Sequence, residues 1–292
     1  MRLRTLPLSL AGVVCGSLLA VVPNGGSGWA LAFLYLTTVS LQILSNLSNE
    51  MGDHLTGVDG DSREGPNYSL SEGGLTVRQM WRAINAFVII CAFSGLLMLL
   101  FSFQFSILNF QFSILLLLGA AAIWAATHYT LGKNPYGYRG LGDLFVFIFF
   151  GLVAVCGAYY VCTHNLTNLY TLLPGSAIGF FSMGVLNVNN IRDMKTDAAT
   201  RTTVALKLGA RRARIYQTIL ICGGWLLMVL YTLLTAHGWT PWLFVLTLPL
   251  YVRHLRGVWR LDGGALDPML PLLVISTFLF SLLAGTGMLL TY

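Results

Sequence analysis

The chain has 292 residues, of which 56% are hydrophobic and 10% charged, and its mean hydropathy is +0.73. Soluble domains carry roughly 25% charged residues. The composition therefore excludes a soluble globular enzyme and a disordered protein. It also excludes a nucleic-acid-binding protein, although the formal net charge is +6. We expect an integral membrane protein that forms one domain over residues 1–292.

Nine apolar runs, almost free of charged residues, are candidates for membrane-spanning helices, which need about 20 residues each. In chain order they are approximately Leu6–Val22, Trp29–Ser48, Met80–Phe101, Phe112–Thr130, Leu144–Val161, Asn168–Val188, Ile215–Thr235, Pro241–Val252 and Pro268–Leu290. The eighth run is the shortest and contains two prolines. The runs are apolar on every face, whereas the strands of a membrane β-barrel alternate polar and apolar residues. An all-α polytopic membrane protein is therefore predicted.

The 17 Lys and Arg residues all precede the first run or fall in alternate loops, between runs two and three, four and five, six and seven, and eight and nine. The remaining loops have none. By the positive-inside rule this places the N-terminus in the cytoplasm and the C-terminus outside, with nine spans in the plasma (inner) membrane. Eight or ten spans would break the one-sidedness. A cleaved signal peptide is disfavoured because no convincing cleavage site follows the first run.

All 11 carboxylates lie on the same, cytoplasmic side, and two short segments concentrate them where the second and sixth runs end. In the first segment, residues 49–59, Asn49 and Asp53 are four residues apart and therefore share one face of a helix. Asp59 lies six residues beyond Asp53, off that face on a regular helix. Gly57 allows the chain to leave helical geometry and bring Asp59 back.

The second segment, residues 189–197, repeats this spacing with Asn189 and Asp193, and Asp197 extends the row by another turn. The two segments lie four runs apart on helices of the same direction. This arrangement suggests two parallel repeats of four helices, followed by a ninth helix. Helix capping or solvation explains any single carboxylate, but two copies of the same pattern favour a binding site.

Oxygen ligands at two membrane-depth helix ends predict a Mg²⁺ site, because carboxylates there are costly to keep charged without partners. Mg²⁺ is usually held by one or two carboxylates together with substrate phosphates. Helix C-termini repel a bare phosphate, so the metal would have to mediate its binding. We expect a diphosphate held between the two segments. The basic residues that could contact its oxygens are Arg63, Arg78, Lys133, Arg139, Lys195 and Arg201.

At these residues, and over essentially its whole length, the chain resembles the UbiA superfamily of intramembrane aromatic prenyltransferases. The resemblance implies nine transmembrane helices, in the two four-helix repeats plus one described above, with two Asp-rich motifs that bind Mg²⁺ and prenyl diphosphate. Motif one corresponds to Asn49, Asp53 and Asp59, and motif two to Asn189, Asp193 and Asp197, with Arg192 beside it. The implied metal ligands are Asp53, Asp59, Asp193 and Asp197.

The branch of the family is indicated by two features. The gap from Asp53 to Asp59 is longer than the three-residue gap common in 4-hydroxybenzoate prenyltransferases, and is similar to the branch acting on 1,4-dihydroxy-2-naphthoate in menaquinone synthesis. The segment YTLGKNPYGYRGLGDLFVFIFFG, residues 129–151, resembles the loop between helices four and five of that branch. The resemblance there implies that Lys133 binds diphosphate and that Tyr138, Arg139 and Asp143 lie near the reacting carbons or the acceptor.

The implied reaction transfers a polyprenyl group from polyprenyl diphosphate to 1,4-dihydroxy-2-naphthoate with loss of CO₂, giving demethylmenaquinol. The implied catalytic residues are Asp53, Asp193, Lys133, Tyr138 and Asp143. The implied diphosphate-binding residues are Asn49, Arg63, Arg78, Lys133, Arg139, Asn189, Arg192, Lys195 and Arg201. Mg²⁺ is the expected cofactor. The two substrates and membrane lipid are the expected partners, with no nucleic acid.

Other functions remain open at this point. A member of the same superfamily with another acceptor, such as 4-hydroxybenzoate, haem or chlorophyllide, is the nearest alternative. A secondary transporter also has many spans and internal repeats, but it usually places its charges near the middle of the membrane. Here the charges gather at one surface, which favours phosphate chemistry. A lipid phosphotransferase is disfavoured because its DG-x2-AR-type motif is absent.

Overall fold

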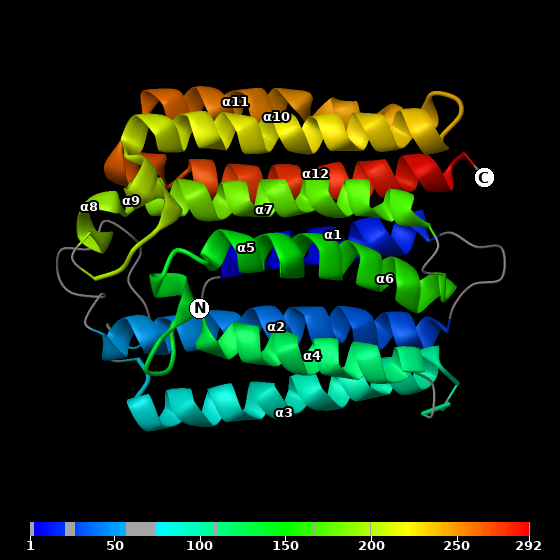
Figure 1. The fold of residues 1–292 in the computed structure, drawn as a ribbon, viewed down its shortest axis with the longest axis horizontal. Coiled ribbons are helices and arrows are strands. Elements are labelled where there is room, and N and C mark those ends of the chain that lie inside the picture. Colours follow the sequence, from blue (N-terminus) through cyan, green and yellow to red (C-terminus); the bar gives the residue numbers. More distant parts are fainter. Residues whose placement is uncertain are drawn as a thin grey trace.

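The computed structural model describes residues 3–20, 27–56, 70, 74–104, 106–107, 110–165, 168–198 and 200–291. In these residues the chain is helical apart from turns, loops and one isolated β-bridge between Arg139 and Thr202. The long helices run side by side along one direction (Figure 1). They are α1 (Leu6–Leu19), α2 (Gly28–Leu55), α3 (Val77–Ser102), α4 (Phe110–His128), α5 (Gly142–Val146), η3 (Phe147–Val153), α6 (Ala154–Thr163), α7 (Leu172–Arg192), α10 (Ala210–Thr235), α11 (Leu248–Arg260) and α12 (Met269–Leu289). The short elements are η1 (Leu3–Thr5), η2 (Tyr136–Tyr138), η4 (Leu169–Thr171), α8 (Met194–Asp197), α9 (Val204–Leu208), η5 (Thr240–Thr247) and η6 (Gly263–Leu266).

Seven of the described helical segments are long and apolar enough to cross a membrane. They are Gly28–Leu55, Val77–Ser102, Phe110–His128, Gly142–Thr163, Leu169–Arg192, Ala210–Thr235 and Gly263–Leu289. The predicted all-α membrane fold is thus confirmed. The first predicted run forms the apolar but shorter helix α1, and the eighth forms η5 and α11, so these two fall short of the criterion that the other seven meet.

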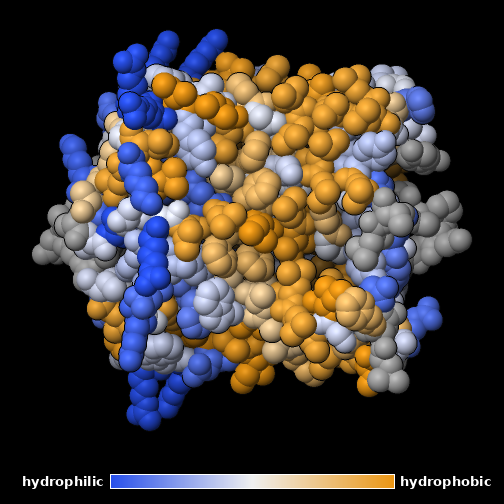
Figure 2. All heavy atoms as spheres, viewed as in Figure 1, coloured by the Kyte–Doolittle hydropathy of each residue, from blue (hydrophilic) through white to orange (hydrophobic). Residues whose placement is uncertain are grey.

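The surface is divided into an apolar body and hydrophilic ends. Apolar side chains cover the middle of the visible face, and hydrophilic side chains gather mainly at the end where α8 and α9 lie (Figure 2). Large apolar side chains in mid-helix, such as Ile89, Leu117 and Leu226, are exposed. A continuous apolar surface of this size is what a membrane-embedded protein presents to lipid. We call the end that carries α8 and α9 the motif end.

Both Asp-rich segments continue transmembrane helices past their apolar runs. Helix α2 extends to Leu55, so Asn49 and Asp53 share a helix face as predicted. Helix α7 ends at Arg192, and Asp193 is the turn residue before α8. The second Asp-rich segment is therefore divided between two helices, α7 and α8, rather than lying on one. The Asp197 N–H nevertheless donates to the Asp193 carbonyl at 2.8 Å, which preserves a helical step between these two residues.

The span that begins at α5 contains a wider helical stretch. Residues Phe147–Val153 form the π-helix η3, between α5 and α6. Such π-helical turns are rare and often occur at functional sites. The stretch packs closely on α7, because a Cβ on Gly151 would lie 2.6 Å from the Cα of Gly179.

Helix α1 is held in the centre of the bundle by close contacts with α6 and α12. At Gly16 a Cβ would lie 2.1 Å from the carbonyl oxygen of Val155. Small residues let membrane helices approach to this distance and gain van der Waals contact. Gly16 is therefore required by the spacing between α1 and α6.

We expect Gly16→Ala to lower the stability of the detergent-solubilised protein by about 1–3 kcal/mol, because the added methyl must push α1 away from α6. Gly95→Ala is the matched control, since its Cβ would meet only the Thr37 Cγ2, at 3.7 Å, and alanine favours the helix. Thermal unfolding followed by circular dichroism measures both. Equal effects of the two substitutions would contradict the packing argument.

Candidate active site

One internal cavity of about 610 Å³ connects the motif end with the interior of the bundle. Its polar end is lined by both Asp-rich segments, through Asn49, Asp53, Asn189, Asn190 and Arg192, and by Arg201. Its other end is lined by apolar residues near the opposite ends of their helices, namely Leu34, Met98, Leu115 and Val161. The cavity therefore has a polar head and a long apolar body.

Motif one is fixed by a tyrosine from the loop that follows α4. Asp53 is buried, and its Oδ1 accepts a hydrogen bond from the Tyr138 hydroxyl at 3.2 Å. The Thr56 hydroxyl lies 3.1 Å from the same tyrosine oxygen. Burial and the adjacent Asp53 charge raise the pKa of Tyr138 to about 12, so the phenol keeps its proton and donates to the carboxylate.

Gly52, inside motif one, allows Thr130 to lie close to the backbone of α2. A Cβ on Gly52 would lie 2.5 Å from the Cβ and Oγ1 of Thr130. The Thr130 hydroxyl donates to the Ser48 carbonyl oxygen at 2.9 Å, and it is also within donating distance of Asn49 Oδ1, at 3.3 Å. The residues just after α4 are thus held directly against the end of α2.

Motif two is organised by a buried arginine. Arg192 donates from Nε and Nη2 to the two carboxylate oxygens of Asp193, each at 2.7 Å. It also donates to Asn189 Oδ1 at 2.9 Å and to Asp267 Oδ1 at 2.7 Å. The second Asp267 oxygen accepts from Arg4 at 2.8 Å. A bidentate pair of this kind fixes both partners in one plane, so Arg192 ties motif two to the residues that precede α12.

The last carboxylate of motif two, Asp197, pairs with Arg201 at 2.6 Å. Its side chain is 1% exposed, and its Oδ2 has no hydrogen-bond partner among the described residues. Burial raises the pKa of Asp197, and the charges of Asp193 and Asp53 raise it further, while Arg201 lowers it. Carboxylates from both motifs therefore act on one another, although only Asp53 lines the cavity, while Asp193 and Asp197 are buried and do not.

These residues fit a Mg²⁺ ion shared with a substrate. No group of three or more His, Cys, Asp or Glu side chains, within the part of the chain that the structure describes, is arranged to hold a metal alone. Mg²⁺ needs only one or two protein carboxylates when phosphate oxygens complete its octahedron. The donors are all oxygens, and the unpartnered Asp197 Oδ2 offers one of them. The predicted ligand Asp59 lies outside the described residues.

The structure brings only some of the predicted basic residues to the cavity. Arg192 and Arg201 line it, whereas Arg78, Lys133, Arg139 and Lys195 are exposed and do not. Their side chains extend from helix ends and loops at the surface, and their contact with a diphosphate stays a prediction. Arg63 lies outside the described residues. Asp143 is buried beside Tyr216, whose hydroxyl donates to it at 2.8 Å, and it does not line the cavity.

Aromatic residues line the cavity, and of these Tyr136 was not predicted from the sequence. Tyr136 and Phe145 stack with ring centroids 4.0 Å apart, and Phe149 lies 6.1 Å from Phe145. All three line the cavity. The faces of such rings attract cations. Tyr136 and Phe145 lie on η2 and α5, and no periodicity of the sequence connects them; the density of aromatic residues in 136–150 is the one available signal.

Comparison with known proteins places these features in context. A model of the UbiA prenyltransferase family matches residues 9–282. The 1,4-dihydroxy-2-naphthoate octaprenyltransferase of Haemophilus influenzae is 36% identical over 99% of this chain and 94% of its own. The enzyme of the same name from Escherichia coli is 36% identical over 100% of this chain and 94% of its own.

Two solved structures share the fold. A UbiA homolog from Aeropyrum pernix K1 superimposes with a TM-score of 0.72 at 18% identity, covering 99% of this chain and 98% of its own. A UbiA homolog from Archaeoglobus fulgidus, bound to GPP and Mg²⁺, superimposes with a TM-score of 0.64 at 16% identity, covering 98% and 99%. At these identities the likeness establishes the fold.

We expect Arg201→Gln to destabilise the protein by about 3 kcal/mol, because it leaves the buried Asp197 without its counter-charge. Asp197→Asn combined with Arg201→Gln removes both charges and should recover most of that loss. Thermal unfolding in detergent, arranged as a double-mutant cycle, measures the coupling. Additive effects of the two substitutions would show that the pair contributes nothing.

Proposed function

This chain belongs to the UbiA prenyltransferase family, and on that premise we propose that it is an aromatic prenyltransferase of menaquinone biosynthesis. The proposed reaction transfers a polyprenyl group from polyprenyl diphosphate to 1,4-dihydroxy-2-naphthoate with decarboxylation, giving demethylmenaquinol. The observation that carries this proposal is the internal cavity, whose polar head is lined by residues of both Asp-rich motifs and whose body is apolar. The identity of 36% with 1,4-dihydroxy-2-naphthoate octaprenyltransferases supports this acceptor.

The two ends of the cavity match the two ends of the donor substrate. An isoprenoid tail is apolar and fits the stretch between Leu34, Leu115 and Val161, while the diphosphate fits the head. At that head Asn49, Asp53 and Asn189 supply oxygen ligands, and Asp193 and Asp197 lie buried behind them and would join the site, with Asp59, when Mg²⁺ binds. Bound Mg²⁺ would neutralise the diphosphate and stabilise the charge that develops on it as the allylic carbon–oxygen bond breaks.

The remaining side chains at the head hold these ligands in place. Arg192 fixes the plane of the Asp193 carboxylate, and Tyr138 holds Asp53 through its phenolic proton. Arg201 adds a positive charge beside Asp197. This charge would stabilise the negative charge that develops on the departing diphosphate. The apolar walls limit the access of water, which would otherwise capture the allylic cation. The rings of Tyr136 and Phe145 supply faces that stabilise positive charge.

Six further residues are proposed on the sequence and the resemblance rather than on their position in this conformation. Lys133 and Arg139 would reach a bound diphosphate if the loops that carry them closed over the head of the cavity, and Lys195 would reach it from α8. Arg78 would act from the start of α3, together with Arg63. Asp143, bonded to Tyr216, would act near the acceptor after the same movement.

We also infer the membrane arrangement from the sequence. Nine spans would form two repeats of four helices plus one, with α1 and the η5–α11 pair as the two short spans, all in one domain over residues 1–292. The N-terminus and the motif end would face the cytoplasm, and the C-terminus the outside of the plasma (inner) membrane. Water-soluble dihydroxynaphthoate would then reach the head directly. Family membership argues against the transporter alternative, while 4-hydroxybenzoate remains the competing acceptor.

Membranes containing this protein should form demethylmenaquinone from 1,4-dihydroxy-2-naphthoate and a polyprenyl diphosphate only when Mg²⁺ is present. Removal of divalent ions with EDTA should abolish product detected by liquid chromatography, and added Mg²⁺ should restore it, because the carboxylates then lose and regain their counter-charge. Undiminished turnover in EDTA would overturn the metal proposal. A preference for 4-hydroxybenzoate in the same assay would overturn the acceptor assignment.

Replacing Asp53 or Asp193 by Asn should lower turnover at least about 100-fold, because each change removes a charged ligand from the diphosphate site. Asp262→Asn is the matched control, since this carboxylate lies at the same end, is exposed, and pairs with Arg214 away from the cavity. The initial rate at saturating substrates is the measurement. Comparable losses in all three variants would contradict the proposed roles.

A further inference from the structure

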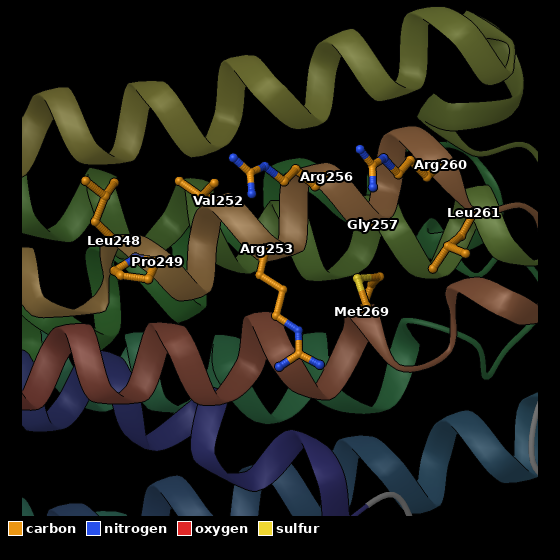
Figure 3. Close-up of a pocket in the computed structure, with 9 residues that line it drawn as sticks. All are labelled: Leu248, Pro249, Val252, Arg253, Arg256, Gly257, Arg260, Leu261 and Met269. Atoms are coloured by element: carbon orange, nitrogen blue, oxygen red, sulfur yellow. The ribbon is translucent and has the colours of Figure 1, made fainter.

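A second cavity, separate from the first, lies on the surface of α11. Its volume is about 570 Å³, and it shares no lining residue with the internal cavity. Leu248, Pro249, Val252, Leu261 and Met269 form an apolar floor, and three arginines surround it, Arg253, Arg256 and Arg260 (Figure 3). Arg253 points across to α12, and the other two lie along the opposite edge of α11. We call this feature the arginine groove.

The groove is built by a close helix contact. A Cβ on Gly257 would lie 2.0 Å from the Met269 sulfur, so the glycine allows the start of α12 to pack directly on α11. Met269 is 8% exposed and forms part of the floor. Arg214 of α10 also donates to the carbonyls of Val258 and Leu261, which fixes the end of α11. The groove is thus a defined concave surface between packed helices.

The three arginines have no carboxylate partner in the part of the chain that the structure describes. The acidic residues that follow α11 are already engaged. Asp262 pairs with Arg214, and Asp267 pairs with Arg4 and Arg192. Three positive charges around one apolar concavity therefore call for an anion from outside the protein.

The position of the groove along the helices indicates which kind of anion it would bind. His254, the neighbour of Arg253, lies with its Nε2 3.0 Å from the Nε2 of Gln217. Gln217 is about 10 Å along α10 from the first residue of that helix. At this level Ile219 and Val252 are exposed and apolar. Arg253 therefore lies beside the lipid-facing surface, where an unpaired charge is costly and long basic side chains turn toward the headgroups.

We propose that the arginine groove binds an anionic phospholipid of the surrounding membrane. The phosphodiester would accept hydrogen bonds from the guanidinium groups, which recognise phosphate through their planar fork, and the acyl chains would lie over Val252, Pro249 and Leu248. Basic pockets between transmembrane helices bind anionic headgroups in this way. Arg211 and Arg212 lie in the first turn of α10 and outside the groove, so they would contribute only to general attraction to the surface.

The test is native mass spectrometry of the purified full-length protein, released from micelles that contain equimolar phosphatidylglycerol and phosphatidylcholine. The wild-type protein should retain phosphatidylglycerol about tenfold in preference to phosphatidylcholine. Arg253→Gln combined with Arg256→Gln and Arg260→Gln should remove this preference. Arg211→Gln combined with Arg212→Gln, which removes two charges from the same end, should leave it within twofold of wild type.

Three outcomes would overturn the proposal: no preference in the wild-type protein, an unchanged preference in the triple variant, or an equal loss in the Arg211 and Arg212 control. Displacement of the lipid by millimolar inorganic phosphate would identify a free-anion site instead and would also overturn it. If the triple variant does not fold, Arg253→Gln alone is scored by the same criterion. Prenyl transfer by the groove variants in phosphatidylcholine should equal that of wild type, because the groove is separate from the internal cavity.

Discussion

Carboxylates from two distant helices come close together beside the head of one cavity, and their mutual repulsion is the constraint that the surrounding structure must balance. Asp53 comes from α2, and Asp193 and Asp197 come from the end of α7 and from α8. Two arginines offset their charges within the protein, Arg192 against Asp193 and Arg201 against Asp197. Buried ion pairs of this kind stabilise a fold only when their remaining atoms are satisfied. The Asp197 oxygen that has no partner among the described residues marks the place where the balance is incomplete.

The position of this site follows from the solvent properties of the bilayer. Placing a diphosphate in hydrocarbon costs free energy, and so does exposing an isoprenoid chain to water. The fold resolves this by extending α2 and α7 past their apolar runs, so that the polar ligands stand at the end of the bundle while the cavity continues down between the helices. The same helices thus supply both the head of the site and its apolar body.

The parts of this arrangement that could be predicted from the sequence are those governed by local spacing. The pairs Asn49–Asp53 and Asn189–Asp193 share helix faces because four residues make about one turn. Contacts that depend on loops could not be predicted. The bonds from Tyr138 to Asp53 and from Tyr216 to Asp143 join elements 85 and 73 residues apart. The positions of Lys133 and Arg139 could not be predicted either, because a sequence motif near the site does not determine where a long side chain in a surface loop points.

The π-helical stretch Phe147–Val153 has a consequence for how the cavity is lined. A π-helix turns through a smaller angle per residue than an α-helix, so it shifts the rotational phase of everything that follows it. Phe145 before the stretch and Gly157 after it face the same cavity, although a continuous α-helix would rotate them apart by a different amount. A deletion of one residue here would let the span relax into a regular α-helix. The faces of α5 and α6 would then stay in register, because the π-helical stretch lags behind an α-helix by about the rotation of one residue.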